Sequence, residues 1–311
     1  MIFAAICAAL VVYCLAQFCI ALFGKRGEKS AWFASVRVAA QDPLLIYFPY
    51  LSFAFFMVPF VLLYFAAFSA KTTGALAWIG IFLGSETPIA ALPPFTRGTG
   101  LGVLLILGVV AAFGLAGYLL IRVMNCAAVH IVNRRLAAEP QATGTAAALV
   151  KHFPAIMSAL LKFRRSAGVN GTFVPQYLMC RGEDASSAIL HSAELVSRLG
   201  LPAGENKPSK ILGMEFAQVR TTAELSGAFM VGIIPVAFLA EYLAIAAVPG
   251  DNFKFAMAVL FGTAIVYALA FFSLASLLDS VYLTAVFAKT SGSASPQLLC
   301  FESAHLARPF P

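Results

Sequence analysis

The sequence predicts an all-α membrane protein with about five transmembrane helices, accompanied by interfacial and amphipathic helices. Three observations support this fold class. Hydrophobic residues make up 61% of the 311-residue chain and charged residues only 11%, a composition that a soluble domain does not need. Five apolar runs are each long enough to cross a bilayer, which takes about 20 residues of helix. Positive charge is concentrated in alternate segments between these runs.

The five apolar runs define the predicted spans. They cover residues 2–23, 43–70, 98–121, 225–248 and 255–278. Four of the runs contain no Asp, Glu, Lys or Arg, and the fourth in chain order is interrupted only by Glu241. We interpret residues 1–311 as a single integral membrane domain, in which residues 122–224 form an inner-side segment with amphipathic helices.

The distribution of Lys and Arg predicts the orientation of the chain. Of the 21 basic residues, 18 lie in residues 24–42, in residues 122–224 or after residue 278. Cytoplasmic segments carry such an excess, so the N-terminus is predicted to lie outside and the C-terminus inside (N-out, C-in). The same excess accounts for the net charge of +7, and we expect no nucleic-acid partner.

The first span is expected to be retained rather than removed as a signal peptide. Met1 opens directly into the apolar run, without a basic region before it or a small-residue cleavage site. None of the six cysteines lies in a predicted outer loop, so we expect no disulfide framework. Cys126 and His130 share a helical face, but a metal site needs more ligands. We expect no metal and no cofactor, apart from bound phospholipid.

Proline and glycine residues shape the next predicted elements. Residues 28–42 form a short helix with a tryptophan at the membrane boundary. Pro43 opens the second span, and Pro49 and Pro59 are expected to kink it. The third span is rich in glycine, which lets neighbouring helices approach closely, and it is expected to continue to about Asn133.

The inner-side segment contains a basic amphipathic stretch at Thr145–Phe163, which we expect Pro154 to break once. Its apolar stripe comprises Leu149, Phe153, Ile156, Leu160 and Phe163. The basic residues around the stripe are Lys151, Lys162, Arg164 and Arg165. Helices of this kind lie in the membrane interface, and each Lys or Arg near an anionic leaflet contributes about 1 kcal/mol. We therefore predict that these four residues bind cardiolipin or another anionic lipid; the alternative is that their charge only sets topology.

The remaining inner-side elements are shorter. Residues 169–180 are apolar but too short to span, and we expect them in the membrane interface. Residues 183–200 predict a helix, with acids at its start, Arg198 near its end and Gly200 after it. Residues 209–224 are predicted to be helical and continuous with the fourth span.

Four blocks of the sequence carry a further signal. They are SAWFASVRVAAQDPLLIYFP at Ser30–Pro49, RVMNCAAVHIVNRRLAAEPQATGTAAA at Arg122–Ala148, FVPQYLMCRGEDASSAILHSAELVSRLG at Phe173–Gly200 and LLDSVYLTAVFAKTSG at Leu277–Gly292. Together they resemble a family of uncharacterised prokaryotic integral membrane proteins (DUF6159-like), over roughly residues 30–292. The resemblance implies a helical membrane architecture and brings no catalytic residues with it.

Three polar residues of the predicted spans are candidates for packing between helices. Asn125, Glu241 and Asp279 each lie near the end of a span. Intramembrane polar groups are functional candidates by default, but a transport site needs several of them to converge near the middle of the membrane. We therefore expect these residues to hold helices together.

The predicted function is non-catalytic. The sequence has no phosphate-binding loop, zinc-protease motif or nucleophile elbow, and we do not expect an enzyme. We predict an accessory or structural subunit of a larger membrane complex, or a lipid-organising scaffold; the alternative is a carrier or channel for a small solute or lipid. The expected partners are membrane lipids and other membrane protein subunits, in a bacterial plasma (inner) membrane or a mitochondrial inner membrane.

Overall fold

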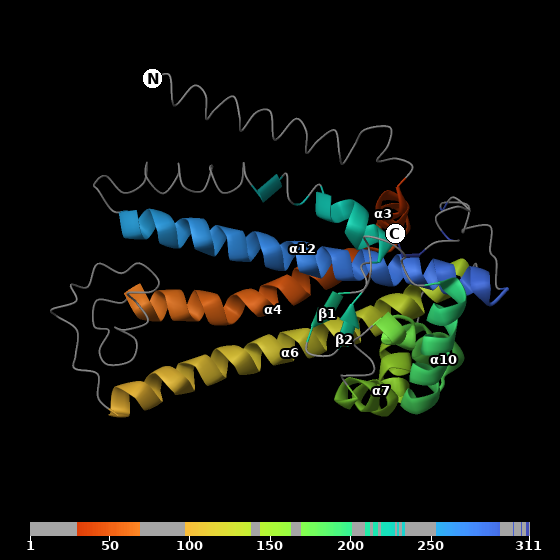
Figure 1. Cartoon of the computed structure of the whole chain (residues 1–311), viewed down its shortest axis with the longest axis horizontal. Coiled ribbons are helices and arrows are strands. Elements are labelled where there is room, and N and C mark those ends of the chain that lie inside the picture. The colour runs from red at the N-terminus through yellow and green to blue at the C-terminus, as the bar shows by residue number, and fades with distance from the viewer. Residues whose placement is uncertain are drawn as a thin grey trace, which may run out of the picture. The chain divides into compact units, whose positions relative to one another are not determined.

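The computed structural model of the chain is dominated by helices in the residues that it describes (Figure 1). It divides into two compact units. Unit 1 comprises Met1–Cys19, Tyr50–Tyr118 and Phe229–Phe272; unit 2 comprises Ile20–Pro49, Leu119–Ala228 and Ser273–Pro311. The described residues are 30–68, 97–137, 144–162, 169–200, 209–211, 214–216, 219–227, 229, 232–233, 253–292, 301, 306 and 309–310.

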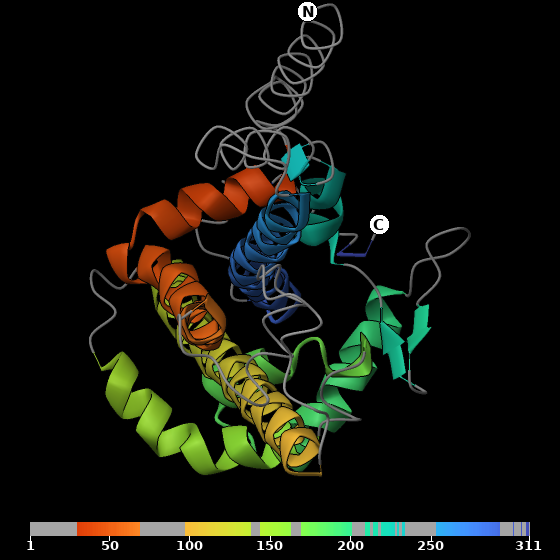
Figure 2. The same cartoon turned by 90° about the vertical axis from the view of Figure 1, so that its left-hand side faces the viewer.

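Unit 1 contains parts of three long helices. These are α4 (Pro43–Phe68), α6 (Arg97–Leu136) and α12 (Phe253–Thr290). Within this unit they lie roughly along a common direction, and Figure 2 views them end-on. The chain runs one way in α4 and the opposite way in α6 and α12 (Figure 1). The ring centre of Phe55 on α4 lies 5.9 Å from that of Phe113 on α6. Tyr267 on α12 stacks at 4.6 Å on Phe229, which lies outside the three helices.

Two helices in the described part of the chain are long and apolar enough to cross a membrane. They are Thr99–Leu136 and Thr263–Thr290, and a third joins them if Ala31–Ala40 and Pro43–Pro59 form one broken span. Only 11% of the most apolar 18-residue window of α6 is buried, and Leu101 is 68% exposed. Soluble proteins rarely expose a continuous apolar surface, whereas hydrocarbon accommodates it. The fold is therefore that of a helical membrane protein with two to three candidate spans among the described residues.

Two of the predicted spans lie largely outside the described residues. Residues 2–23 are not described, and of residues 225–248 only 225–227, 229 and 232–233 are. Those few residues are helical. The total of five spans and the orientation of the chain therefore stay predictions.

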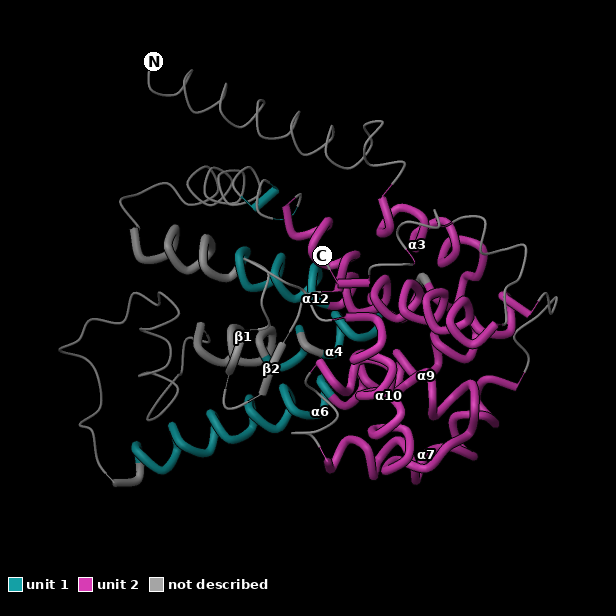
Figure 3. Tube along the Cα trace, turned by 45° about the vertical axis from the view of Figure 1, so that its right-hand side comes forward, with its two compact units in different colours: residues 1–19, 50–118, 229–272 teal, residues 20–49, 119–228, 273–311 magenta. Residues whose placement is uncertain are grey.

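Unit 2 is drawn in magenta in Figure 3. Buried apolar side chains form its core. Its own elements are α3 (Ala31–Ala40), α7 (Thr145–Leu161), η2 (Val169–Gly171), α9 (Val174–Gln176), η3 (Tyr177–Arg181) and α10 (Ala185–Leu199). The start of α4, the ends of α6 and α12, and the described parts of residues 209–227 also belong to it. Its largest fully buried side chains include Tyr282, Phe173, Ile131, Ile156 and Leu178. Helix α6 continues to Leu136, which confirms the predicted extension of the third span, and α12 continues to Thr290, past the predicted end of the fifth span at residue 278.

Helix α10 shows how local sequence determines one element of unit 2. The carboxylate of Asp184 caps its start and accepts hydrogen bonds from the amides of Ser186 and Ser187. Gly200 follows its end with φ 78°, a conformation that glycine adopts without strain. Its buried face consists of Ala185, Ala188, Ser192, Leu195 and Val196. The helix predicted for residues 183–200 is therefore confirmed.

The segment predicted to lie in the membrane interface, residues 169–180, lies in the core of unit 2 instead. Phe173, Val174 and Leu178 are 0%, 3% and 1% exposed. The amide of Phe173 donates to Oγ of Ser192 on α10 at 3.0 Å. The prediction is wrong because apolar composition alone does not distinguish burial by protein from burial by lipid.

A short hairpin replaces the first part of the helix predicted for residues 209–224. Strand β1 (Ser209–Ile211) pairs antiparallel with β2 (Met214–Phe216), and helical structure begins at residue 220. The prediction is therefore wrong for residues 209–216. The two residues between the strands include Gly213, and short loops that contain glycine favour a hairpin over a helix.

Candidate functional site: the outward face of helix α7

Helix α7 has two apolar faces. Its inner face packs on the core of unit 2 through Ile156 and Ala159, which are 2% and 4% exposed. Its outer face carries Val150, Phe153 and Leu161, which are 75%, 48% and 83% exposed. The spacing of these three residues places them on one side of a helix, because they fall close to whole turns of 3.6 residues. This outer face is an exposed apolar surface, and we call it the α7 surface.

The apolar stripe predicted for this helix is only partly correct. Leu149, Ile156 and Leu160 pack inward against the core of unit 2, and Phe153 faces outward. Phe163 lies outside the described residues. The prediction failed because both faces of the helix are apolar, so a single stripe assigned the exposed valine and leucine to the polar side.

Pro154 does not break α7, contrary to the prediction. The helix runs without interruption from Thr145 to Leu161 with the proline inside it. A proline removes one backbone hydrogen bond and disturbs the turn before it. Inner-face side chains on both sides of it, including Leu149 and Ile156, pack on the core and hold the helix in place.

Two of the four predicted lipid-binding residues are described, and both are exposed. Lys151 lies on the second turn of α7 and Lys162 directly after its end. The Nζ atom of Lys162 donates a hydrogen bond to Oγ of Ser186, at the start of α10, over 2.6 Å. Arg164 and Arg165 lie outside the described residues. Because residues 145–161 contain no Asp or Glu, the charge that α7 itself carries is positive.

The contact of Lys162 lies next to the cap of α10. The carboxylate of Asp184 accepts from the hydroxyl of Ser187 at 2.6 Å and from the amide of Ser186 at 2.9 Å. The bond from the Ser187 hydroxyl, followed by the backbone bonds, lowers the pKa of Asp184 below its ordinary value. The ionised carboxylate also suits the partial positive charge at the start of a helix.

Asn125 and Asp279, two of the three residues predicted to pack helices, both bond to other elements of unit 2. Nδ2 of Asn125 on α6 donates to Oγ of Ser276 on α12 at 2.8 Å. The carboxylate of Asp279 accepts from the hydroxyls of Thr221 and Thr222 and from the amide of Thr222 at 3.2 Å. These bonds join α12 to α6 and to the helix that contains both threonines.

The third packing candidate, Glu241, lies outside the described residues. Cys126, which shares a helical face with His130 in the sequence, is 3% exposed inside α6. In the part of the chain that the structure describes, no three His, Cys, Asp or Glu side chains lie together in a way that could hold a metal ion.

Sequence reasoning missed the role of Glu224. Its Oε2 atom accepts from the amide of Ala31, the first residue of α3, at 2.8 Å. Its Oε1 atom pairs with Nε of Arg220 at 2.9 Å. The carboxylate thus caps a helix that begins 193 residues earlier in the chain, and no local motif can indicate such a contact.

Comparisons with protein families, curated proteins and solved structures find no match for this chain. The resemblance of the four sequence blocks to a membrane protein family therefore stays a prediction. The function has to be argued from the geometry.

Proposed function

We propose that this protein is a non-catalytic multipass membrane scaffold that organises anionic lipid, either by itself or as an accessory subunit of a larger membrane complex. The observation that supports it best is the α7 surface, which is apolar and exposed with lysines beside it. In this proposal Val150, Phe153 and Leu161 insert at the boundary between headgroups and acyl chains. Lys151 and Lys162 lie at the level of the headgroups.

The apolar and basic parts of the α7 surface contribute differently. Complete removal of a large apolar side chain from water contributes about 1.5–3 kcal/mol, and the three side chains of the surface are 48–83% exposed. Each lysine near an anionic leaflet adds about 1 kcal/mol. Apolar burial is therefore the larger contribution and places the helix, whereas the lysines select anionic headgroups such as those of cardiolipin.

The proposed topology has five spans, with the N-terminus outside and the C-terminus inside. The positive charge of alternate segments supports it. In this topology span two crosses the membrane in the opposite direction to spans three and five. The chain direction in α4 is likewise opposite to that in α6 and α12 (Figure 1). An impermeant thiol reagent applied from outside should label a cysteine placed at Thr73 and not one placed at Asn206. The reverse labelling pattern would contradict the topology.

Packing, rather than transport, is the proposed role of the polar residues in the spans. Asn125 and Asp279 both bond to other helices, and a transport site needs such groups to face one cavity. The carrier or channel alternative differs in one measurable property. The purified chain in liposomes should give no ion or solute flux in this proposal, and flux in the alternative.

The depth of α7 in the membrane tests the proposal directly. Phe153→Trp places an indole on the α7 surface, and its fluorescence is measured in nanodiscs that contain lipids brominated at different depths. We expect the strongest quenching from bromines close to the headgroups. The unsubstituted chain, with its two native tryptophans, provides the background. Quenching that does not rise above this background would refute an interfacial α7.

Lipid retention tests the role of the lysines. Lys151→Gln with Lys162→Gln should lower the amount of anionic lipid that remains bound through purification, as measured by mass spectrometry. Lys71→Gln, which removes one charge from a segment predicted to lie outside, is the control and should leave the lipid content unchanged. If the lysine variant also retains all its anionic lipid, the charge serves only topology.

A further inference from the structure

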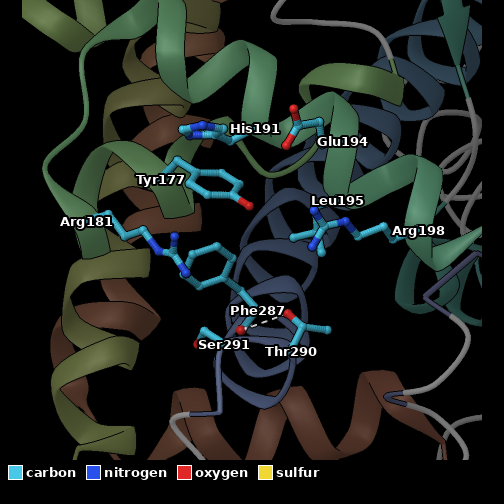
Figure 4. A pocket seen from close by; sticks show the side chains of 9 residues that line it. All are labelled: Tyr177, Arg181, His191, Glu194, Leu195, Arg198, Phe287, Thr290 and Ser291. Carbon is cyan, nitrogen blue, oxygen red and sulfur yellow. Dashed lines mark hydrogen bonds between the residues drawn. The ribbon is translucent and has the colours of Figure 1, made fainter.

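Unit 2 has a cavity of about 170 Å³ that is open to the surface, apart from the α7 surface. Its charged lining residues, Arg181, Glu194 and Arg198, are exposed. Its walls come from η3, α10 and the last turn of α12, and Figure 4 shows the side chains that line it. A cavity that holds one water needs roughly 10–15 Å³, whereas pockets for drug-sized ligands measure about 300–1,000 Å³. The cavity therefore suits a small polyatomic group rather than a large ligand.

Two guanidinium groups face each other across this cavity. Arg181, from η3, and Arg198, from the last turn of α10, extend into it from opposite sides, and the hydroxyl of Tyr177 points between them (Figure 4). The Cζ atom of Arg181 lies 5.4 Å from the ring centre of Tyr177 and 5.6 Å from that of Phe287. These contacts involve the faces of the aromatic rings, so the in-plane N–H groups of the arginine can serve an acceptor.

The backbone of η3 places the tyrosine and the arginine on one wall. Tyr177–Arg181 is a π-helical turn, and Gly182 ends it with φ 68°. The positive φ favours glycine here, and a Cβ atom at position 182 would also lie 3.3 Å from the ring of His152 on α7, which would have to shift slightly. Turns of this type occur often at functional sites.

Other charges around the cavity limit what it can bind. Oε2 of Glu183 lies 2.8 Å from Nδ1 of His191, so the carboxylate of Glu183 already has a partner. Glu194 lines the cavity and opposes a bound anion. The hydroxyls of Thr290 and Ser291 donate to carbonyls of the last turn of α12. Recognition of an anion therefore depends on the two arginines and on the tyrosine hydroxyl, which is a donor at neutral pH because the ordinary pKa of tyrosine is about 10; burial raises the pKa of Tyr177 further.

We propose that this cavity binds a phosphoryl group. A phosphoryl group presents several acceptor oxygens in a tetrahedral arrangement, which allows it to accept from Arg181, Arg198 and Tyr177 at once. A carboxylate has two oxygens, and one bidentate arginine satisfies both. Two sources share the phosphoryl chemistry, a lipid headgroup and a soluble phosphate ester. The inference does not rest on the proposed function, because no residue of the α7 surface takes part.

The test uses the full chain in maltoside micelles, which contain no phosphate. Glycerol phosphate is the soluble probe and phosphatidylglycerol, added to the micelles, is the lipid probe; binding is measured by calorimetry and by the shift in unfolding temperature. Arg181→Gln and Arg198→Gln should each weaken binding about tenfold or more, since each loses charge-assisted hydrogen bonds. Glu194→Gln should strengthen binding. Arg37→Gln, which lies outside the cavity, is the matched control.

The outcomes separate the two sources. Saturable binding of glycerol phosphate assigns the cavity to a soluble ester, and binding of phosphatidylglycerol alone assigns it to a headgroup. Failure of both probes to bind, or binding that the two arginine variants leave unchanged, overturns the proposal. Arg181→Lys keeps the charge and loses the guanidinium fork, so it should weaken binding while the unfolding temperature without ligand stays the same. The α7 lysines remain intact in all variants, which keeps this result independent of lipid binding at α7.

Discussion

The two parts of helix α6 are both apolar, but they lie in opposite environments. In unit 1, Leu101 and Leu105 are each 68% exposed. In unit 2, Val129 and Ile131 are fully buried at 0%. Lipid tails are as apolar as leucine and give helices no hydrophobic reason to associate, whereas the unit 2 end of α6 is enclosed by protein. Unit 2 should therefore depend on side-chain packing for its stability, and the exposed part of unit 1 should not.

A matched pair of leucine truncations tests this difference with the largest expected effect. Leu178→Ala truncates a side chain that is 1% exposed in the core of unit 2. Such a truncation should lower the free energy of unfolding by about 2–5 kcal/mol. Leu105→Ala removes an exposed leucine and should change stability by about 0.5 kcal/mol or less. Thermal unfolding in detergent measures both. Equal losses in the two variants would contradict the contrast between the protein-packed core of unit 2 and the exposed part of unit 1.

The polar contacts of unit 2 should give an intermediate effect. Asp279→Ala leaves the hydroxyls of Thr221 and Thr222 without their acceptor, which costs about 1–3 kcal/mol when such groups are buried. Asp279→Asn keeps one acceptor oxygen and should cost less. Asn125→Ala removes one bond between helices and should cost about 0.6 kcal/mol. The unfolding temperatures of these three variants in detergent measure the order of their stability losses.

Flux measurements with the same variants distinguish packing from transport. Neither the unsubstituted chain nor Asp279→Asn should conduct ions or small solutes in liposomes. If the unsubstituted chain conducts and the correctly folded Asp279→Asn variant does not, the result would favour a carrier and contradict the scaffold proposal.

The contrast between the units also explains which features could be predicted from sequence. Apolar length identified α6 and α12, because about 20 residues of helix match the bilayer whatever surrounds them. Local signals identified α10, since Asp184 and Gly200 act on backbone groups within a few residues of themselves. Both kinds of signal are contained in a short stretch of chain.

Features that depend on distant residues could not be predicted in this way. The stripe predicted for α7 combined the outward Phe153 with three residues that pack on the core, because only the packed structure decides which of two apolar faces the core covers. The cavity combines Arg181, Arg198 and Phe287, which come from three separate elements. Residues 169–180 were expected in the membrane interface because hydropathy does not distinguish burial by protein from burial by lipid.

The smallest expected effect concerns the cap of α10, and it depends on pH. Hydrogen bonds from Ser187 and Ser186 lower the pKa of Asp184 in the folded state, so the ionised carboxylate stabilises unit 2 at pH values above the ordinary pKa of an aspartate, about 4. This contribution is lost as the pH falls through the lower folded-state pKa. Asp184→Ala should therefore reduce the unfolding temperature slightly at pH 7, and the difference from the unsubstituted chain should shrink in acid. Asp184→Asn retains a capping oxygen without a charge, so its stability relative to Asp184→Ala should not vary with pH over this range. A loss in Asp184→Ala that is the same at pH 7 and pH 3 would mean that the charge on the cap contributes nothing.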